Sequence, residues 1–445
     1  MEGVQERRRI EPLARPLDAT VRLPGSKSIT NRALVCAALA HGRSTLRGAL
    51  FSDDTEAMVE CLRSLGFSIT ADAARAELVI VGAGGQVPAS HAQIDVRLSG
   101  TTARFVTPLL ALGHGTYVVE AQGRMRERPM DDLLRVLSEL GAVVEHAEGR
   151  AVFPFTVHAS GLRGGEVEVA GDASSQFLSG LLLSGPAMRD GLGVRVTTPL
   201  VSEPYVQLTL AVLRSFGAVA GDPEHLRYCV EPGSLAACDY AIEPDASAAS
   251  YFFAAAALCG GRVRVEGLGA DALQGDVRFV DVLERMGARV VREPHAIEVS
   301  GTGELVGIDV DMSDISDTAQ TVAAIAPFAR GRTRVTGIGF IRRKETDRIG
   351  AVVAELRRCG IEASEQPDGF TIEPGVPHAA AFSTYGDHRM AMAFSLIGLR
   401  VPGIEIRDPG CVAKTFPGFF DAIEGLGVGV GSRGHLPGAV TSSRC

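Results

Sequence analysis

The chain has 445 residues, of which 46% are hydrophobic and 22% are charged, and its formal net charge at pH 7 is −9. This length exceeds what one hydrophobic core supports and predicts two or three domains. The negative charge argues against a broad nucleic-acid-binding surface. The N-terminus lacks the apolar run of a signal peptide, and the longest apolar run, near Tyr251–Cys259, is too short to cross a bilayer.

Eight cysteines are scattered along the chain without a C-x-x-C pair or a metal-ligand spacing. This pattern favours a reduced, cytoplasmic setting and predicts neither a disulfide framework nor a metal site. Because the net charge is negative, any site for an anion requires a local concentration of cations.

Taken in chain order, six Ala/Leu-rich runs recur at intervals of 70 to 73 residues, each preceded by a polar residue: Ser28, Thr101, Ser174, Ser247, Asp317 and His388. The runs predict short, buried helices. These helices are expected over residues 31–39, 103–112, 177–183, 251–258, 319–328 and 390–399.

An amphipathic helix that closes on a glycine follows in every repeat, at Gly66, Gly141, Gly217, Gly287, Gly360 and Gly427. Glycine at these points predicts left-handed helix C-caps. Since strand-like segments separate the helices, each repeat is predicted to be a small α/β module, and its period is too long for a solenoid. We expect two domains of three modules, comprising residues 19–242 and residues 1–18 plus 243–430, with 431–445 as a disordered tail.

Lysine occurs only at Lys27, Lys344 and Lys414, although lysine and arginine together number 44. An exposed surface tolerates either residue, so a strong bias toward arginine should have replaced every dispensable lysine. An ammonium group is compact, and its pKa shifts readily enough to move a proton. The sequence therefore predicts that all three lysines are kept for chemistry.

Polar and charged residues gather where the predicted helices begin, in every repeat except the fourth, where Ser247 is predicted to be structural. Helix N-termini present unpaired N–H groups and favour anions, and arginine forks bind carboxylate and phosphate. The pattern predicts a site for a ligand with several anionic groups. A single Ser or Thr there is more often a cap, and Arg126 and Arg128 are predicted to pair with Glu127 or Asp131 on a solvated face.

Eight motifs in order, over residues 19 to 428, resemble those of the 5-enolpyruvylshikimate-3-phosphate synthase family. The resemblance implies an α/β fold of two similar domains, each of three βαβαββ units (an inside-out α/β barrel), with the active site in the interdomain cleft. It also implies transfer of an enolpyruvyl group from phosphoenolpyruvate to the 5-hydroxyl of shikimate 3-phosphate, without metal or organic cofactor. The motifs lie at residues 23–34, 99–104, 123–129, 171–176, 202–205, 344–348, 387–392 and 413–417.

The resemblance further implies the residues that bind each substrate. Shikimate 3-phosphate is expected at Lys27, Ser28, Arg32, Ser174, Ser175, Gln176, Ser202, Tyr205, Asp317 and Lys344. Phosphoenolpyruvate is expected at Lys27, Gly100, Arg124, Gln176, Arg348, His388, Arg389 and Lys414. Asp317 is the implied base on the 5-hydroxyl and Glu345 the implied proton donor to the methylene carbon, with Lys27 and Lys344 as further catalytic residues. The expected partners are these two substrates, with no nucleic acid and no membrane, and the protein is expected to be a monomer.

Three positions depart from the family pattern, because Leu98, Glu203 and Phe340 stand where members carry Asn, Lys and Asn. The last position normally contacts the shikimate phosphate. The resemblance therefore defines the enolpyruvyl transfer more closely than it defines the acceptor. The alternatives are an enolpyruvyl transferase for a secondary-metabolite hydroxyl or for UDP-N-acetylglucosamine, and a non-catalytic anion-binding relative.

Each alternative conflicts with some residues of the sequence. Transferases for UDP-N-acetylglucosamine place a cysteine on the loop where this chain has Arg124. A non-catalytic relative would not need Asp317, Glu345 and the three lysines. An ATP-dependent kinase is excluded, because the residues around Lys27 do not form a G-x-x-x-x-G-K-[ST] loop.

Overall fold

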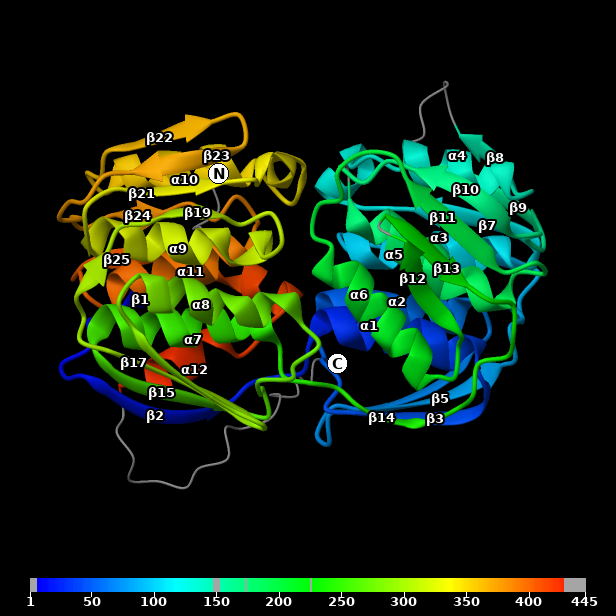
Figure 1. Cartoon of the computed structure of the whole chain (residues 1–445), viewed down its shortest axis with the longest axis horizontal. Coiled ribbons are helices and arrows are strands. Elements are labelled where there is room, and N and C mark those ends of the chain that lie inside the picture. The colour runs from blue at the N-terminus through cyan, green and yellow to red at the C-terminus, as the bar shows by residue number, and fades with distance from the viewer. Residues whose placement is uncertain (1–5, 147–152, 173, 225, 428–445) are drawn as a thin grey trace. The chain divides into compact units, whose positions relative to one another are not determined.

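The computed structural model describes residues 6–146, 153–172, 174–224 and 226–427. These residues form two compact units, which Figure 1 colours by residue number. The inserted unit is Gly25–Glu243, and the split unit combines the residues up to Pro24 with those from Pro244 onward.

The described part of the inserted unit contains three four-stranded sheets. In each sheet the first pair of strands is parallel and the other two pairs are antiparallel. In spatial order the strands are β14 (Asp239–Ala241), β3 (His41–Arg47), β5 (Glu77–Ala83) and β4 (Ser68–Asp72); β6 (His91–Asp95), β7 (His114–Glu120), β9 (Phe155–Ser160) and β8 (Val143–His146); and β10 (Gly165–Val169), β11 (Leu192–Val196), β13 (Arg227–Val230) and β12 (Ala220–Glu224).

Two classes of helix cover these sheets. The nearly apolar helices α1 (Lys27–Leu39), α3 (Gly100–Ala111) and α5 (Ser175–Ser184) contact one another and are buried almost throughout. The amphipathic helices lie one per module and bury one face only. They are α2 (Asp53–Ser64), α4 (Asp131–Glu139) and α6 (Pro204–Ser215), with short helices η1 (Gly123–Glu127) and η3 (Gly185–Ala187).

The split unit repeats this plan over its described residues. Its sheets are β2 (Leu17–Arg22), β15 (Gly261–Glu266), β17 (Ala296–Gly301) and β16 (Arg289–Glu293); β19 (Asp309–Asp311), β21 (Thr333–Thr336), β23 (Gly369–Ile372) and β22 (Ala363–Gln366); β24 (Ala381–Phe382), β25 (Ile404–Arg407) and β1 (Arg7–Ile10); and the short pair β18 (Leu305–Val306) and β20 (Ala329–Arg330). Its central helices are α7 (Ala246–Cys259), α9 (Ala319–Ile325) and α11 (His388–Gly398).

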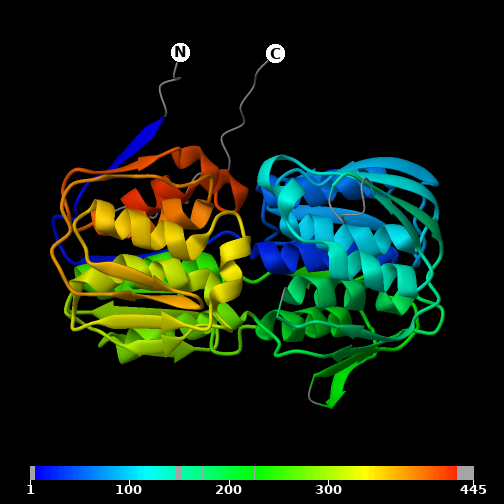
Figure 2. The same ribbon diagram turned by 90° about the horizontal axis from the view of Figure 1, so that it is seen from above.

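The remaining helices of the split unit are α8 (Phe279–Arg285), α10 (Arg348–Arg358) and α12 (Phe419–Gly425), with short helices η4 (Gly275–Arg278), η5 (Ser316–Thr318), η6 (Ala326–Phe328), η7 (Gly339–Arg343) and η8 (Pro409–Lys414). Within each unit the helices lie at the centre and the sheets outside, as Figures 1 and 2 show. Each unit has its own buried hydrophobic core. The expected inside-out α/β fold of βαβαββ modules is confirmed.

The units exchange their first strands. β2 precedes α1 in sequence but pairs with β15, and β14 precedes α7 but pairs with β3. The chain therefore crosses at Pro24–Gly25 and at Glu243–Pro244. The expected domain 19–242 differs from this, since residues 19–24 continue β2 into the split unit. The tail expected at 431–445 lies outside the described residues.

Most central helices begin earlier than their apolar runs predicted: α1 starts at Lys27 rather than residue 31, and α3 at Gly100 rather than residue 103, whereas α9 starts at Ala319 as predicted. Ser28, Thr101, Ser247 and His388 thus lie in the first helical turn, where backbone N–H groups lack intrahelical partners. Ser174 is the N-cap of α5, and Asp317 lies in η5, just before α9. The expected left-handed glycine caps are confirmed at Gly66, Gly141, Gly217, Gly287 and Gly360.

Candidate active site

Lys27 is the first residue of α1, and Ser26 caps the helix by accepting a hydrogen bond from the Ile29 N–H. The Lys27 Nζ lies 3.2 Å from Asp54 Oδ2 on α2, and this carboxylate is almost completely buried. Asp54 thus fixes the ammonium group at the helix N-terminus. Asp54 was not among the predicted site residues, because it stands among other acidic residues in the first turn of α2 and resembles an ordinary helix start.

Arg32 lies one turn further along α1 and is 1% exposed. Its guanidinium donates to the hydroxyls of Thr209 (2.8 Å) and Ser179 (3.2 Å) and to the backbone oxygens of Ser28 (2.9 Å) and Tyr205 (3.0 Å). These acceptors are neutral, and burial lowers the pKa of Arg32 to about 10. A buried cation held by neutral oxygens retains its attraction for an anion.

Gln176 links two central helices. Its Oε1 accepts from Arg104 Nη1 at 3.1 Å, and its Nε2 donates to the Thr101 hydroxyl at 3.2 Å. Arg104 also donates to the Gly100 backbone oxygen at 3.2 Å. The first turns of α3 and α5 are therefore tied by one polar network, in which Arg104 connects Gly100 with Gln176.

Gly100 faces two arginines. A Cβ atom at this position would lie 2.5 Å from Arg128 Nη1 and 2.6 Å from Arg104 Nη1. The Arg128 side chain therefore packs against Gly100, and its pairing with Glu127 or Asp131 stays a prediction. Arg126 pairs with Glu120 at 3.2 Å instead of Glu127 or Asp131.

The other candidates of the inserted unit lie at helix starts or on η1. Ser174 caps α5 and accepts from the Gln176 N–H, and Ser175 is buried at its first position. Ser202 has a positive φ of 55°, which is uncommon for a residue with a side chain, just before Tyr205 of α6. Arg124 is exposed on η1.

Two of the three departures from the family pattern lie in this unit. Glu203 accepts a hydrogen bond from the Tyr228 hydroxyl at 3.1 Å, which ties its charge to β13. Leu98 is 51% exposed and lies against Gly123 at the start of η1.

Asp317 is the centre of the second cluster of charges, in the split unit. Its Oδ1 lies 2.6 Å from Lys344 Nζ and 3.1 Å from Arg348 Nη1, and its Oδ2 lies 2.7 Å from Arg389 Nη2. Burial opposes its ionisation, but Arg389, Lys344 and Arg348 together hold the pKa of Asp317 well below its ordinary value. Burial and the neighbouring arginines lower the pKa of Lys344, against the opposing effect of Asp317.

Arg348 is 1% exposed and contacts three carboxylates. Its Nε and Nη2 bind Asp387 at 2.7 and 3.2 Å, its Nη2 also binds Glu345 at 2.9 Å, and its Nη1 binds Asp317. Burial would lower the pKa of Arg348, but these carboxylates raise it above its ordinary value. Asp387 was not among the predicted site residues, although it opens the motif that contains His388 and Arg389.

The structure therefore groups Asp317, Lys344, Glu345, Arg348 and Arg389 as the sequence predicted. His388 is buried at the first position of α11, with Nδ1 3.6 Å from Asp387 Oδ1. Lys414 is 6% exposed at the end of η8. The third departure, Phe340, places its ring 5.5 Å from Lys344 Nζ in a cation–π contact.

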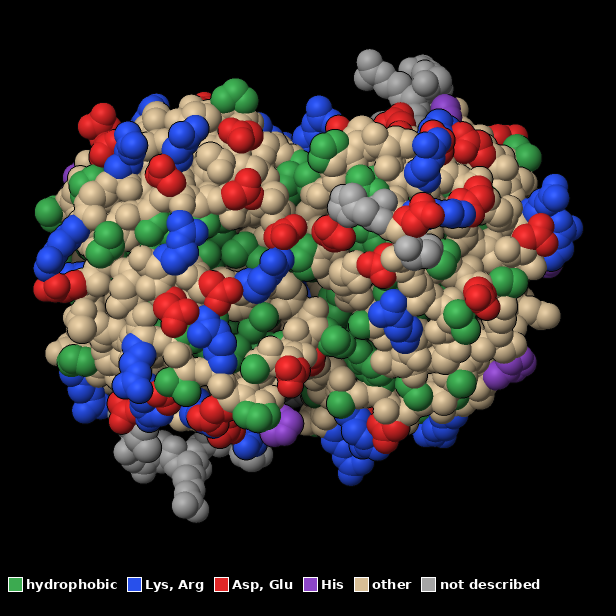
Figure 3. All heavy atoms as spheres, viewed as in Figure 1, with side chains coloured by type: hydrophobic (Ala, Val, Ile, Leu, Met, Phe, Trp, Pro, Cys, Tyr) green, Lys and Arg blue, Asp and Glu red, His purple; other side chains and the backbone are tan. Residues whose placement is uncertain are grey.

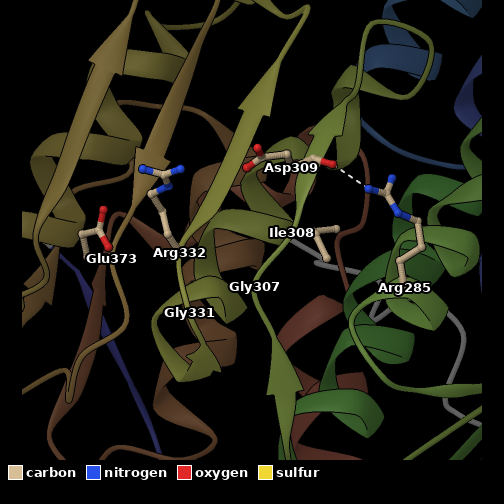
Figure 4. Close-up of a pocket in the computed structure, with 7 residues that line it drawn as sticks. All are labelled: Arg285, Gly307, Ile308, Asp309, Gly331, Arg332 and Glu373. Atoms are coloured by element: carbon tan, nitrogen blue, oxygen red, sulfur yellow. Dashed lines mark hydrogen bonds between the residues drawn. The ribbon is translucent and has the colours of Figure 1, made fainter.

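A separate cavity of about 580 Å³ opens in the split unit and is shown in Figure 4. No sequence-predicted site residue lines it. The lining residues are Arg285, Gly307, Ile308, Asp309, Gly331, Arg332 and Glu373. On the face drawn in Figure 3, basic and acidic side chains are interspersed. Among the described residues, none of the helices is long and apolar enough to cross a membrane.

Comparisons with known proteins show which family the chain belongs to. The family model described as EPSP synthase (3-phosphoshikimate 1-carboxyvinyltransferase) matches residues 13–423. The chain is 48% identical over 412 residues to the 3-phosphoshikimate 1-carboxyvinyltransferase of Nostoc punctiforme, covering 92% of this chain and 97% of that one. It is 42% identical to the enzyme of that name from Sulfurovum, covering 93% and 97%.

Solved structures show the same fold. The EPSP synthase from Acinetobacter baumannii superimposes with a TM-score of 0.80 at 26% identity, covering 94% of this chain and 98% of that one. The enolpyruvyl transferase NikO from Streptomyces tendae superimposes with a TM-score of 0.74 at 20% identity, covering 95% and 97%, and shows the fold alone. By its family match and by the identity and coverage of these relatives, the chain belongs to the EPSP synthase (3-phosphoshikimate 1-carboxyvinyltransferase) family.

Proposed function

We propose that this chain transfers the enolpyruvyl group of phosphoenolpyruvate to the 5-hydroxyl of shikimate 3-phosphate and releases phosphate. The observation that carries the proposal is the family match over residues 13–423. This range includes the polar residues around Lys27 and Arg32 and the charged residues around Asp317. The product, 5-enolpyruvylshikimate 3-phosphate, belongs to the shikimate pathway of aromatic amino acid biosynthesis.

The proposed substrate contacts follow the sequence assignments. Phosphoenolpyruvate would meet the cations Lys27, Arg124, Arg348, Arg389 and Lys414, which offset the charge of its phosphate and carboxylate. Shikimate 3-phosphate would meet the first turns of α1, α5 and α6, where Ser174, Ser175 and Ser202 supply hydroxyls. Arg32 supports this assignment, because the oxygens that accept its hydrogen bonds in the described part of the chain are neutral.

The proposed reaction is an addition followed by an elimination. The 5-hydroxyl oxygen bonds to carbon 2 of phosphoenolpyruvate while carbon 3 takes a proton from Glu345 and the hydroxyl proton passes to Asp317. The bond between carbon 2 and the phosphate oxygen then breaks, carbon 3 returns a proton to Glu345 to restore the double bond, and the hydroxyl proton leaves Asp317 with the phosphate. Lysine ammonium groups stabilise the departing phosphate.

The charges around Asp317 indicate how it becomes a base. With three cations within 3.1 Å, its carboxylate has little affinity for a proton. The carboxylate of phosphoenolpyruvate would draw Arg348 and Arg389 toward itself, and losing those contacts would raise the proton affinity of Asp317. Substrate binding and activation of the base would then be one event.

A second candidate function is the same chemistry on a different hydroxyl acceptor. Phe340 favours it, because a phenyl ring facing Lys344 cannot donate a hydrogen bond to a phosphate. We retain shikimate 3-phosphate as the first candidate because the motifs that hold Ser174, Ser202 and Tyr205 are intact.

The test is an assay of phosphate release with phosphoenolpyruvate and either shikimate 3-phosphate or shikimate, with the product identified by ³¹P NMR. We expect turnover with shikimate 3-phosphate and at most a trace with shikimate. Absence of turnover with shikimate 3-phosphate would contradict the proposal. Release with shikimate alone would favour the second candidate.

We also propose that the protein works as a monomer in the cytoplasm. The cysteines in the described part of the chain are free, which supports a reducing setting. Light scattering of the purified protein at assay concentration measures the oligomeric state, and a mass near 46.7 kDa is expected.

A further inference from the structure

Glu355 is a buried carboxylate that the proposed mechanism does not use. It lies on α10 and is 0% exposed. Its Oε1 accepts from the Tyr385 hydroxyl at 2.7 Å, and its Oε2 accepts from the Ser383 N–H at 3.0 Å and from Arg358 Nε at 2.8 Å. A buried acid satisfied this fully holds its partners in one geometry.

Two of these partners lie on the segment that leads into α11. The Asp387 N–H donates to the Thr384 oxygen at 2.9 Å, which closes a four-residue turn. Both central residues of the turn have positive φ, 56° at Tyr385 and 68° at Gly386. Glycine adopts this conformation easily, but a tyrosine does so only when its surroundings impose it. The bond to Glu355 is such a constraint.

The same helix holds this turn at a second point. Arg348 and Glu355 are seven residues apart on α10, so they share one face of the helix, about 10 Å apart along its axis. Arg348 binds Asp387 at the end of the turn, and Glu355 binds Ser383 and Tyr385 at its start. Hydrogen bonds from α10 therefore hold the turn on both sides.

Asp387 connects the turn to Arg348 and Arg389. It accepts two bonds from the Arg348 guanidinium and caps α11 by accepting from the Arg389 N–H at 2.9 Å. The position of Asp387 thus fixes the Arg348 guanidinium and the first turn of α11, from which the Arg389 side chain extends to Asp317. A shift of the turn would move both arginines.

We propose that Glu355 and Tyr385 are positioning residues, whose bond sets the Thr384–Asp387 turn and thereby the two arginines that receive the carboxylate of phosphoenolpyruvate. This inference deepens the proposed function and rests on it for the identity of the ligand. Neither residue touches the substrate in this scheme, and both act through Asp387.

The test compares three variants with a matched control. Tyr385→Phe removes the hydroxyl alone, Glu355→Gln replaces one acceptor oxygen by an N–H donor, and Tyr385→Gly removes the hydroxyl together with the strained φ. Tyr117→Phe is the control, because its hydroxyl donates to the Ala89 oxygen at the same 2.7 Å on β7 of the inserted unit.

We expect Tyr385→Phe and Glu355→Gln to raise KM for phosphoenolpyruvate roughly tenfold, the order of one hydrogen bond to a charged group. KM for shikimate 3-phosphate should change less than about twofold, because the two arginines bind phosphoenolpyruvate and not the acceptor in this scheme. Tyr385→Gly should behave like Tyr385→Phe, and Tyr117→Phe should leave both KM values unchanged.

A merely structural role would give lower melting temperatures with unchanged KM values, or equal rises in both KM values, and either result overturns the inference. Wild-type KM in Tyr385→Phe also overturns it. Hydrogen exchange provides a readout without turnover, because the Asp387 amide should exchange faster in Tyr385→Phe than in the wild type. An inactive wild-type protein would contradict the proposed function, whereas unchanged exchange at Asp387 would contradict the positioning role.

Discussion

The two units build the same modules but treat the charge at their helix starts differently. In the inserted unit the central helices α1, α3 and α5 are capped by Ser26, Ser99 and Ser174, all uncharged. In the split unit α7 and α11 are capped by Asp245 and Asp387, and α10 by Asp347. The central helices of the inserted unit thus have serine caps, whereas two of the three in the split unit, α7 and α11, have carboxylate caps and α9 begins after Thr318.

The cations differ in the same way. Arg32 of the inserted unit is held by neutral oxygens, whereas Lys344, Arg348 and Arg389 of the split unit all bind Asp317. Positive potential at Arg32 is therefore available to an anion directly, whereas Lys27 of the same unit already faces the buried carboxylate of Asp54. In the split unit an incoming anion must compete with a carboxylate of the protein, which couples its binding to a change at Asp317.

The largest effect should come from removing the carboxylate at the centre of the split unit's cluster. Asp317→Ala should reduce turnover by about 10²–10⁴-fold, the usual contribution of a general acid or base. Steady-state phosphate release measures this. Asp276→Asn is the control, since Asp276 is also buried, near the start of α7, and bonds to Ser247. Comparable losses in both variants would contradict a special role for Asp317.

Lysine replacement tests one lysine of each unit. Lys27→Arg should lower turnover by about 10–100-fold, the value of one charged hydrogen bond, because a guanidinium is larger than the ammonium group beside Asp54 and does not readily give up a proton. Lys414→Arg should behave similarly. Arg135→Lys on an exposed face of α4 should be silent. Turnover near wild type in both lysine variants would refute the idea that the three lysines are kept for chemistry.

Gly100→Ala tests how much space the inserted unit leaves for an anionic ligand beside Gly100. We expect glyphosate, which carries a phosphonate, a carboxylate and an amine, to compete with phosphoenolpyruvate. The new Cβ must displace Arg104 and Arg128, a crowding effect of about 1–3 kcal/mol. The larger inhibitor should lose more affinity than the substrate, by isothermal titration calorimetry with shikimate 3-phosphate present. Gly425→Ala, where a Cβ meets open space, is the control. Equal losses for both ligands would contradict this account.

A smaller effect is expected at Phe340, whose ring lies 5.5 Å from Lys344 Nζ. Phe340→Leu should reduce kcat/KM for the acceptor by about 2–30-fold, the range of a cation–π contact. Phe328→Leu removes a comparable contact with Arg400, at 5.0 Å, and should leave kcat/KM unchanged. An increase in kcat/KM for Phe340→Leu would show that the ring obstructs the acceptor.

The smallest effect concerns acid stability. The folded pKa of Asp317 lies well below the unfolded value near 3.9, so its ionisation contributes stability that is complete above about pH 4. This contribution falls by at most about 1.4 kcal/mol per pH unit as pH drops through that window toward the folded pKa. Urea unfolding between pH 5 and 2 should show a shallower pH dependence for Asp317→Asn than for the wild type. Parallel curves of unfolding free energy against pH for the two proteins would contradict the lowered pKa of Asp317.

The sequence predicted the modules and most of the charge clusters, because both repeat at a fixed spacing. It could not predict Asp54 or Glu355, since each resembles an ordinary helix carboxylate until its partner is known. Tyr385 lies thirty residues beyond Glu355, and only the pairing of α10 with that turn brings them together. The sequence predicted that residues 1–18 join the second domain, but it placed the first crossing at residue 19 rather than at Pro24–Gly25, because the pairing of β2 with β15 is not visible in the sequence.

The exchange of strands between the units sets a timetable for synthesis. At about 5–20 residues per second, the inserted unit is complete roughly ten to forty-five seconds after Gly25 is made. Its last strand, β14, closes its first sheet. β2 must wait for β15, and β1 waits longer, for β25. An unpaired strand edge invites aggregation. β1 carries Arg7, Arg8 and Arg9 in succession, and on the nascent chain these like charges repel other strands until Glu405 and Glu424 arrive to bind Arg7 and Arg8.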